Sequence, residues 1–225
     1  AQANQAGAQM GYAVATAGDV NNDGFADMIV GGPYYDDPWG DEGAAWVWHG
    51  SSLGLNGGEN GTPDNAQWHA RANENGAMLG ISVSTAGDVN GDTFADVIVG
   101  AYQYGALEQG VAAVWHGSAE GVNGGAEGIP IVGNAGWLAT GAPDGAHLGR
   151  SVSTAGDVNS DGYADVIVGA PHYSNYEGNE GAIYLYLGSG DGLGWAAAQQ
   201  KESNAEDAWL GQSVALAGDV NGDGY

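Results

Sequence analysis

The chain has 225 residues, with 28 Asp and Glu against 3 Lys and Arg, 43 Gly and no Cys, and its formal charge is −25. So acidic a surface repels phosphate backbones and no apolar run is long enough to cross a bilayer, so we expect no nucleic-acid partner and no membrane span. The lack of Cys excludes disulfides and thiolate metal sites, so stability must come from packing, bound ions or both. The 8 Trp and 11 Tyr supply the bulky apolar surface of an ordered chain.

An internal repeat organises the whole sequence. The segment GYAVATAGDVNNDGFADMIVGGP recurs in altered form, as GISVSTAGDVNGDTFADVIVGAY, GRSVSTAGDVNSDGYADVIVGAP and the shorter GQSVALAGDVNGDGY. The four copies begin at Gly11, Gly80, Gly149 and Gly211, at spacings of 69, 69 and 62 residues. A second block follows in each full copy: GAAWVWHGS, GVAAVWHGS and GAIYLYLGS. The chain therefore contains three whole units and the start of a fourth.

Each whole unit predicts four short strands. In the first unit, residues 13–17 alternate as a strand does, residues 28–30 form a short apolar run, residues 44–49 are apolar on both faces, and residues 66–72 fit a weaker outer strand. The outer strands of the next two units are expected at residues 137–141 and 195–201. Along the third strand, one face carries Trp48, Trp115 and Tyr186 and the other carries Val47, Val114 and Leu185. No window shows a convincing helical stripe.

Sheets that are apolar on both faces must stack against one another. Radial stacking gives an all-β propeller with four-stranded antiparallel blades, and an innermost strand rich in Ala and Ser suits its crowded axis. A linear β-solenoid is the alternative, but its coils are usually far shorter than these units. We expect blades at residues 11–72, 80–142 and 149–202, a truncated fourth blade at 211–225, and the end of a preceding outer strand or a linker at 1–10.

The loop between the first two strands carries the chemistry. Oxygen-bearing side chains stand at its positions 1, 3, 5 and 9 and Gly at position 6, as in the front half of a calcium loop, where position 7 offers its carbonyl. The predicted ligands of the first loop are Asp19, Asn21, Asp23, Asp27 and the Phe25 carbonyl. The second loop gives Asp88, Asn90, Asp92, Asp96 and the Phe94 carbonyl, and the third gives Asp157, Asn159, Asp161, Asp165 and the Tyr163 carbonyl. The fourth reaches only a partial set, Asp219, Asn221 and Asp223.

This loop differs from an EF-hand, which needs Glu at position 12 and a helix on each side. Position 12 is Val30, Val99 or Val168, inside the second strand of each unit. Oxygen ligands without His or Cys favour Ca²⁺ over zinc, and the span and flexibility of the loop favour it over magnesium. The alternative is an Asp, Asn and Gly turn that binds nothing, but three carboxylates converging in each loop would then repel one another without compensation.

Weak calcium sites imply a location. Extracellular modules bind calcium with dissociation constants of about 10⁻⁴ to 10⁻³ M, and such sites are filled outside a cell and empty in a cytosol. We therefore expect an extracellular protein, secreted or on the cell surface, whose folding is linked to calcium. Thr93 replaces the Gly of the other loops, and because a β-branched residue resists positive φ, the second site is expected to be distorted or weaker.

The order of these elements resembles FG-GAP repeats, the units of the integrin α-subunit propeller. Met10-Gly11, Leu79-Gly80 and Leu148-Gly149 stand where the family often has Phe-Gly, followed in each unit by the acidic loop and by an element that reads IVGGP, IVGAY or IVGAP. The resemblance covers essentially the whole chain. It implies a propeller, commonly of seven blades, with calcium in the hairpins on one face and a binding surface on the other.

Three blades and a fraction do not close such a ring. Two readings stay open: the sequence is an excerpt of a longer protein, which we favour, or several chains complete one another through open blade edges. The mass of the native polypeptide separates them.

No catalytic constellation stands out, so we expect a non-catalytic adhesion, binding or assembly module. GSSLG around Ser52 matches a nucleophile pattern that needs a strand-to-helix elbow, and Ala119 replaces the Ser in the next copy. The variable loops between the second and third strands, which include Tyr34, Trp39 and Tyr176, are expected to bind a protein or a glycan. A lectin-like propeller and the non-catalytic propeller of a secreted enzyme remain alternatives, and Asn60 begins a glycosylation sequon.

Overall fold

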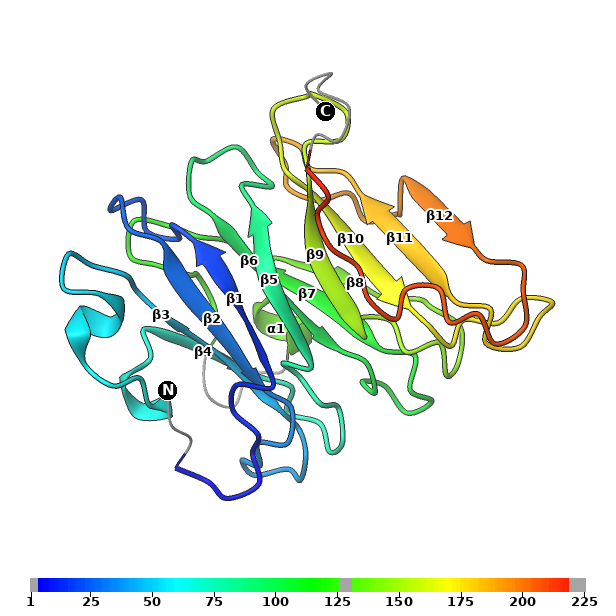
Figure 1. Cartoon of the computed structure of the whole chain (residues 1–225), viewed down its shortest axis with the longest axis horizontal. Coiled ribbons are helices and arrows are strands. Elements are labelled where there is room, and N and C mark those ends of the chain that lie inside the picture. The colour runs from blue at the N-terminus through cyan, green and yellow to red at the C-terminus, as the bar shows by residue number, and fades with distance from the viewer. Residues whose placement is uncertain (1–3, 126–130, 219–225) are drawn as a thin grey trace.

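The computed structural model describes residues 4–125 and 131–218, and it consists mainly of three four-stranded antiparallel sheets (Figure 1). Each sheet comes from one repeat, with its strands in sequence order. The fold class expected from the sequence is confirmed. The partial fourth loop, with Asp219, Asn221 and Asp223, lies outside the described residues.

The strands lie close to the predicted positions. The first sheet contains β1 (Ala13–Gly18), β2 (Asp27–Gly32), β3 (Ala44–Trp48) and β4 (Trp68–Arg71). The second contains β5 (Ser82–Gly87), β6 (Asp96–Ala101), β7 (Val111–Trp115) and β8 (Trp137–Ala139). The third contains β9 (Ser151–Gly156), β10 (Asp165–Ala170), β11 (Ala182–Tyr186) and β12 (Gln199–Glu202).

In the part of the chain that the structure describes, helical structure is confined to a few residues. The short helix α1 (Ile131–Asn134) and two 3₁₀ turns, η1 (Leu55–Gly58) and η2 (Pro63–Asn65), lie in the loops that lead to the outer strands. Segments of three or four residues are too short to show a helical stripe in the sequence. In α1 the Asn134 side chain accepts a bond from the Trp115 indole, at 2.9 Å, so the helix covers the end of the second sheet.

Successive sheets stack face to face, with β1, β5 and β9 side by side on the inner edge (Figure 1). Each repeat completes its own antiparallel sheet, so the sheets are blades and the solenoid alternative is wrong. The glycines of the second strands permit this close stacking. A Cβ on Gly31 would lie 1.9 Å from the Gly80 carbonyl, and one on Gly100 would lie 1.9 Å from that of Gly149.

Aromatic side chains join each pair of neighbouring blades. Trp68 of the first blade meets Trp115 of the second edge to face, with ring centroids 5.2 Å apart. Trp137 of the second blade meets Tyr186 of the third in the same way, at 4.7 Å. These rings bury the large area that the scarce aliphatic side chains do not supply.

The three blades differ in how much of their inner strand is covered. Val14, Val83 and Val152 occupy the same repeat position, but they are 58%, 8% and 6% exposed, respectively. Val83 and Val152 pack in cores shared with the preceding blade. The face of the first blade that carries Val14 is therefore exposed to solvent, whereas the equivalent faces of the second and third blades are buried against the preceding blade.

Candidate metal-binding hairpins

The β1–β2 connection folds around its own acidic side chains. Asp19 accepts hydrogen bonds from the backbone amides of Asp23, at 3.0 Å, and Gly24, at 2.8 Å. Asp23 accepts one from the amide of Phe25, at 3.0 Å. Such side-chain bonds to the local backbone are typical of Asp and Asn turns. They fold the loop backbone around the side chains of Asp19 and Asp23.

The other two described hairpins repeat this pattern. In the second, Asp88 accepts bonds from the amides of Asp92 and Thr93, at 3.1 and 2.8 Å. In the third, Asp157 accepts bonds from the amides of Asp161 and Gly162, at 3.1 and 2.9 Å. The sequence pattern therefore produces one local structure three times.

In each of the three described hairpins, the ninth-position Asp links two parts of the blade through hydrogen bonds. Asp27 accepts the amide of Val20 at 2.8 Å with one oxygen and the amide of Gly50, just after β3, at 2.7 Å with the other. Asp96 and Asp165 bond the equivalent amides in their own blades. All three carboxyls are buried. This role was missed by sequence reasoning, because the second partner lies more than 20 residues further along the chain.

Burial raises the pKa of these three carboxyls above its usual value. It raises the pKa of Asp96 to about 7, although the amides of Val89 and Gly117 oppose the shift, and the neighbouring charges of Asp92 and Asp88 raise it further. The pKa of Asp27 and that of Asp165 are also raised, chiefly by burial. Because the first, fifth and ninth carboxylates of the second hairpin act on one another, a cation at their centre would relieve a repulsion that is already present.

The donor set fits a hard divalent cation. Each hairpin offers three carboxylates, one amide oxygen and a backbone carbonyl, and calcium takes six to eight oxygen ligands from such groups. Within residues 4–125 and 131–218, no three His, Asp or Glu side chains are grouped closely enough to form a ready-made metal site. The carboxylates instead accept backbone amides. Each carboxylate oxygen has a second lone pair available to a cation.

The first and second hairpins are also hydrogen-bonded to the next blade. The carbonyl of Asp19 accepts the amide of Ala95, in the second hairpin, and the carbonyl of Val20 accepts the amide of Ser118, both at 3.0 Å. The second and third blades repeat both bonds, from Ala164 to Asp88 at 2.9 Å and from Ser189 to Val89 at 3.1 Å. An ion that stiffens one hairpin therefore acts directly on the contact with the following blade.

Thr93 does not distort the second hairpin. It adopts a φ of 76°, in the left-handed region that Gly24 and Gly162 also use, and its amide keeps the bond to Asp88. The backbone distortion expected from the sequence is therefore absent. The Thr93 hydroxyl also accepts a hydrogen bond from the Asn22 side chain of the first hairpin, at 3.3 Å, which a Gly could not do.

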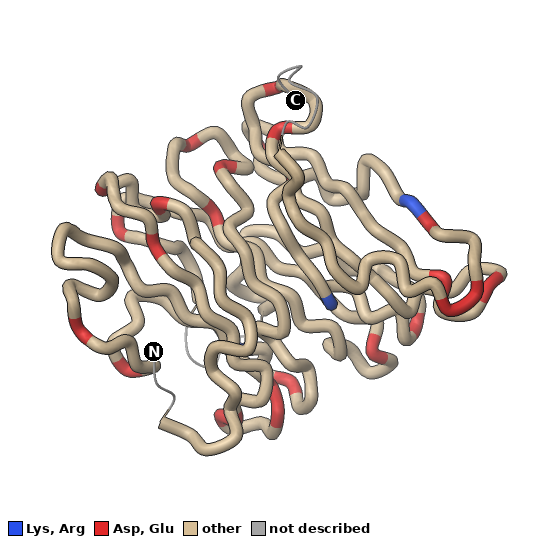
Figure 2. Tube along the Cα trace, in the orientation of Figure 1, with Lys and Arg blue, Asp and Glu red and all other residues tan. Residues whose placement is uncertain are grey.

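The opposite ends of the strands carry the variable loops. Tyr176 is 92% exposed and Trp39 is 50% exposed, as expected of residues available to a partner. Figure 2 shows that Asp and Glu gather in the loops at both ends of the blades. The Ser52 pattern lies in an irregular turn after β3, and Asn60 is exposed.

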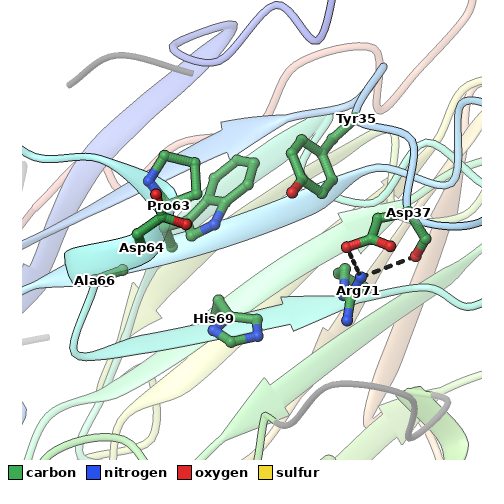
Figure 3. Close-up of a pocket in the computed structure, with 8 residues that line it drawn as sticks. Tyr35, Asp37, Pro63, Asp64, Ala66, His69 and Arg71 are labelled. Carbon is green, nitrogen blue, oxygen red and sulfur yellow. Dashed lines mark hydrogen bonds and ion pairs between the residues drawn. The ribbon is translucent and has the colours of Figure 1, made fainter. Parts of the chain in front are cut away.

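A pocket of about 300 Å³ opens beside β3 and β4 of the first blade (Figure 3). Tyr35 packs edge to face against Trp46, with ring centroids 5.2 Å apart. Arg71 is buried, forms an ion pair with Asp37, and donates to the Asp37 carbonyl at 2.9 Å. Sequence reasoning missed this pair, because its partners are 34 residues apart.

Comparison with known proteins gives a consistent result. The FG-GAP repeat family matches residues 10–48, 79–116 and 148–186, which are the three blades without their outer strands. The chain is 34% identical over 170 residues to integrin alpha-PS2 of Drosophila melanogaster, covering 74% of this chain and 12% of that protein. It is 32% identical over 177 residues to integrin alpha-3 of Cricetulus griseus, covering 75% of this chain and 15% of that protein. The chain thus spans a small part of the curated relatives it matches.

Proposed function

Because the chain belongs to the FG-GAP repeat family, we propose that it is a calcium-binding segment of an extracellular adhesion propeller, without catalytic activity of its own. One observation carries the calcium assignment. The same five oxygen donors recur in three hairpins, and in each the ninth-position carboxyl is buried while its loop partners remain accessible at the surface. Buried carboxylates that face like charges favour a bound cation.

In this proposal, Asp19, Asn21, Asp23, Asp27 and the Phe25 carbonyl hold the first ion, and the equivalent residues hold the second and third. The cation supplies positive charge that offsets the repulsion among the carboxylates. Since the hairpins bond the following blades, calcium stabilises the stack as well as the single loop. Calcium sites with dissociation constants of about 10⁻⁴ to 10⁻³ M are filled only where calcium is abundant, so we place the protein outside the cell.

Calcium titration tests the proposal. We expect calorimetry to detect calcium binding to the chelator-treated chain and the melting temperature to rise with calcium. At a calcium concentration one hundred times the dissociation constant, one site should add about 2.7 kcal/mol to the free energy of unfolding. Equal concentrations of magnesium are the control for ionic strength. A melting curve that EGTA leaves unchanged, together with no heat of binding, would contradict the calcium assignment.

The variable loops are the proposed binding surface. A protein ligand is the first candidate, since the relatives named above are integrin α-subunits. A glycan is the second, because the exposed rings of Trp39 and Tyr176 offer flat surfaces for sugar rings. Replacement of both by Ala should abolish binding to a glycan array if the second candidate is right. Binding that survives this change excludes these rings as the glycan site.

The open face of the first blade is a further proposed contact. Val14 is exposed where its equivalents are buried, so another blade, from a second copy of the chain or another part of a longer protein, fits there. Sedimentation velocity over a range of concentrations checks for self-association, with Val14→Asp as the blocking variant. The exposed Leu53→Asp serves as its control. A monomer at all concentrations removes the second copy as the partner.

A further inference from the structure

His49 lies just after β3, between the first hairpin and the second blade. We propose that His49 is a positioning residue that orients the Asn21 amide, so that the amide oxygen faces the cation of the first hairpin. The proposal rests on the calcium function above, and it predicts that hairpins with the same ligands differ in affinity.

The hydrogen bonds of Asn21 carry the argument. One amide hydrogen of Asn21 goes to Asp23, at 3.1 Å, and the Nδ2 atom also lies 3.4 Å from Nδ1 of His49. Nδ1 accepts a hydrogen only in the tautomer that has its proton on Nε2, so this contact assigns that tautomer. Both N–H groups of the amide are then occupied. The amide cannot rotate by half a turn without losing both bonds, so its oxygen stays directed into the loop, where it accepts the backbone amide of Asp23 at 3.2 Å.

The second blade holds the His49 ring in place. Nε2 of His49 is buried beside Gly121 of the second blade and has no hydrogen-bond partner within the described residues, so the ring is held by packing and by its Nδ1 contact. A Cβ on Gly121 would lie 2.8 Å from the imidazole, and Gly121 has a φ of 105°, so a side chain there would both displace the ring and strain the backbone. The backbone amide of His49 donates to the Gln67 side chain at 3.0 Å, which fixes the other end of the residue. The ring is thus positioned by two blades.

The repeats provide an internal comparison. His116 occupies the same position in the second blade and packs toward Gly192, but no hydrogen bond joins it to Asn90 among the described residues. In the third blade the position is Leu187, and the amide of Asn159 bonds only Asp161, at 2.9 Å, in the described part of the chain. Of the three described hairpins, only the first therefore has an outer partner for its amide ligand. Outer partners of metal ligands affect metal affinity because they fix ligand orientation.

Three variants of the whole chain test this role. His49→Leu introduces the residue that the third repeat already has, His49→Asn keeps an acceptor close to the position of Nδ1, and His116→Leu is the matched control. Calcium titrations followed by NMR report each hairpin separately, through the backbone amides of Gly24, Thr93 and Gly162. The side-chain amide resonances of Asn21 report the bond itself.

We expect His49→Leu to weaken calcium binding at the first hairpin by about tenfold and to shift the Asn21 side-chain resonances. His49→Asn should restore most of the affinity, and His116→Leu should leave the affinity of the second hairpin nearly unchanged. Equal affinity in the wild type and His49→Leu would overturn the positioning role while leaving the calcium function intact. No calcium-dependent shift in the wild type would overturn both.

Discussion

The two ends of the blade contacts are built by different means. At the hairpin end, both described contacts use the same pair of backbone hydrogen bonds, from Ala95 and Ser118 in one and from Ala164 and Ser189 in the other. At the loop end, the second contact contains two imidazole rings that pack at a tilt, with the centroids of His147 and His172 4.3 Å apart. The first contact has Met78 and Gln103 at the equivalent positions. The hairpin end thus repeats its backbone bonds from one contact to the next, whereas the side chains at the loop end differ between the two contacts.

The sharpest test of the hairpin end is removal of a ninth-position carboxyl. Asp96→Ala leaves the buried amides of Val89 and Gly117 without partners, so we expect a loss of about 2–4 kcal/mol in the free energy of unfolding. Asp165→Ala should cost less, because Val158 is 41% exposed and water can reach its amide. Urea unfolding followed by Trp fluorescence, in EDTA so that metal makes no contribution, measures both. Equal costs would contradict the difference in burial.

Two valines test the contact between a hairpin and the next blade. Each is the second residue of its hairpin loop. Val20 is fully buried against the second blade, and Val158 is its largely exposed equivalent in the third hairpin. We expect Val20→Ala to lower the free energy of unfolding by about 2 kcal/mol. Val158→Ala should change it by less than about 0.5 kcal/mol. The same unfolding assay distinguishes them, and a large effect of Val158→Ala would show that the third hairpin has support the structure does not display.

The loop end should respond to pH through Glu42. Burial raises the pKa of Glu42 to about 7, so the folded state keeps its proton over a range in which the unfolded state, with a pKa near 4.5, has lost it. Stability from this group is therefore fully present below the unfolded pKa and is lost as pH rises through 7. Glu42→Gln, which copies Gln109 of the second blade, should stabilise the chain by about 1–2 kcal/mol at pH 8 and have little effect at pH 4.5. Thermal unfolding at both pH values checks the sign.

The smallest expected effect comes from His172, and its dependence on pH is opposite to that of Glu42. Burial, followed by the nearby His147 and Arg150, lowers the pKa of His172, while Glu108 opposes the shift. The unfolded chain then takes up a proton more readily than the folded chain as pH falls below 6.5, and stability declines on acidification. His172→Gln, with the residue that stands at position 103, should remove this part of the pH dependence. A wild-type stability curve that the substitution leaves unchanged between pH 7 and 5 would contradict this assignment.

Much of the fold follows from local pattern. The period-two alternation of residues 13–17 and the apolar runs of the second and third strands predicted nine strands close to where they lie, because these strands are short and bounded by Gly and Asp turns. The outer strands were predicted less precisely: β12 spans Gln199–Glu202, whereas the sequence pattern placed it at 195–201. Outer strands carry a weak pattern because one edge is open to solvent.

The sequence by itself determined the repeat, the order of the strands and the candidate oxygen donors of each hairpin, because the repeat is visible on self-comparison and the strands and donors are encoded by residues a few positions apart. Only the tertiary structure decided that Asp27 ties two strands together, that Arg71 pairs with Asp37, and that His49 reaches Asn21. These partners are 23, 34 and 28 residues apart. Their meeting depends on how the strands pair and the blades stack, which no local spacing encodes.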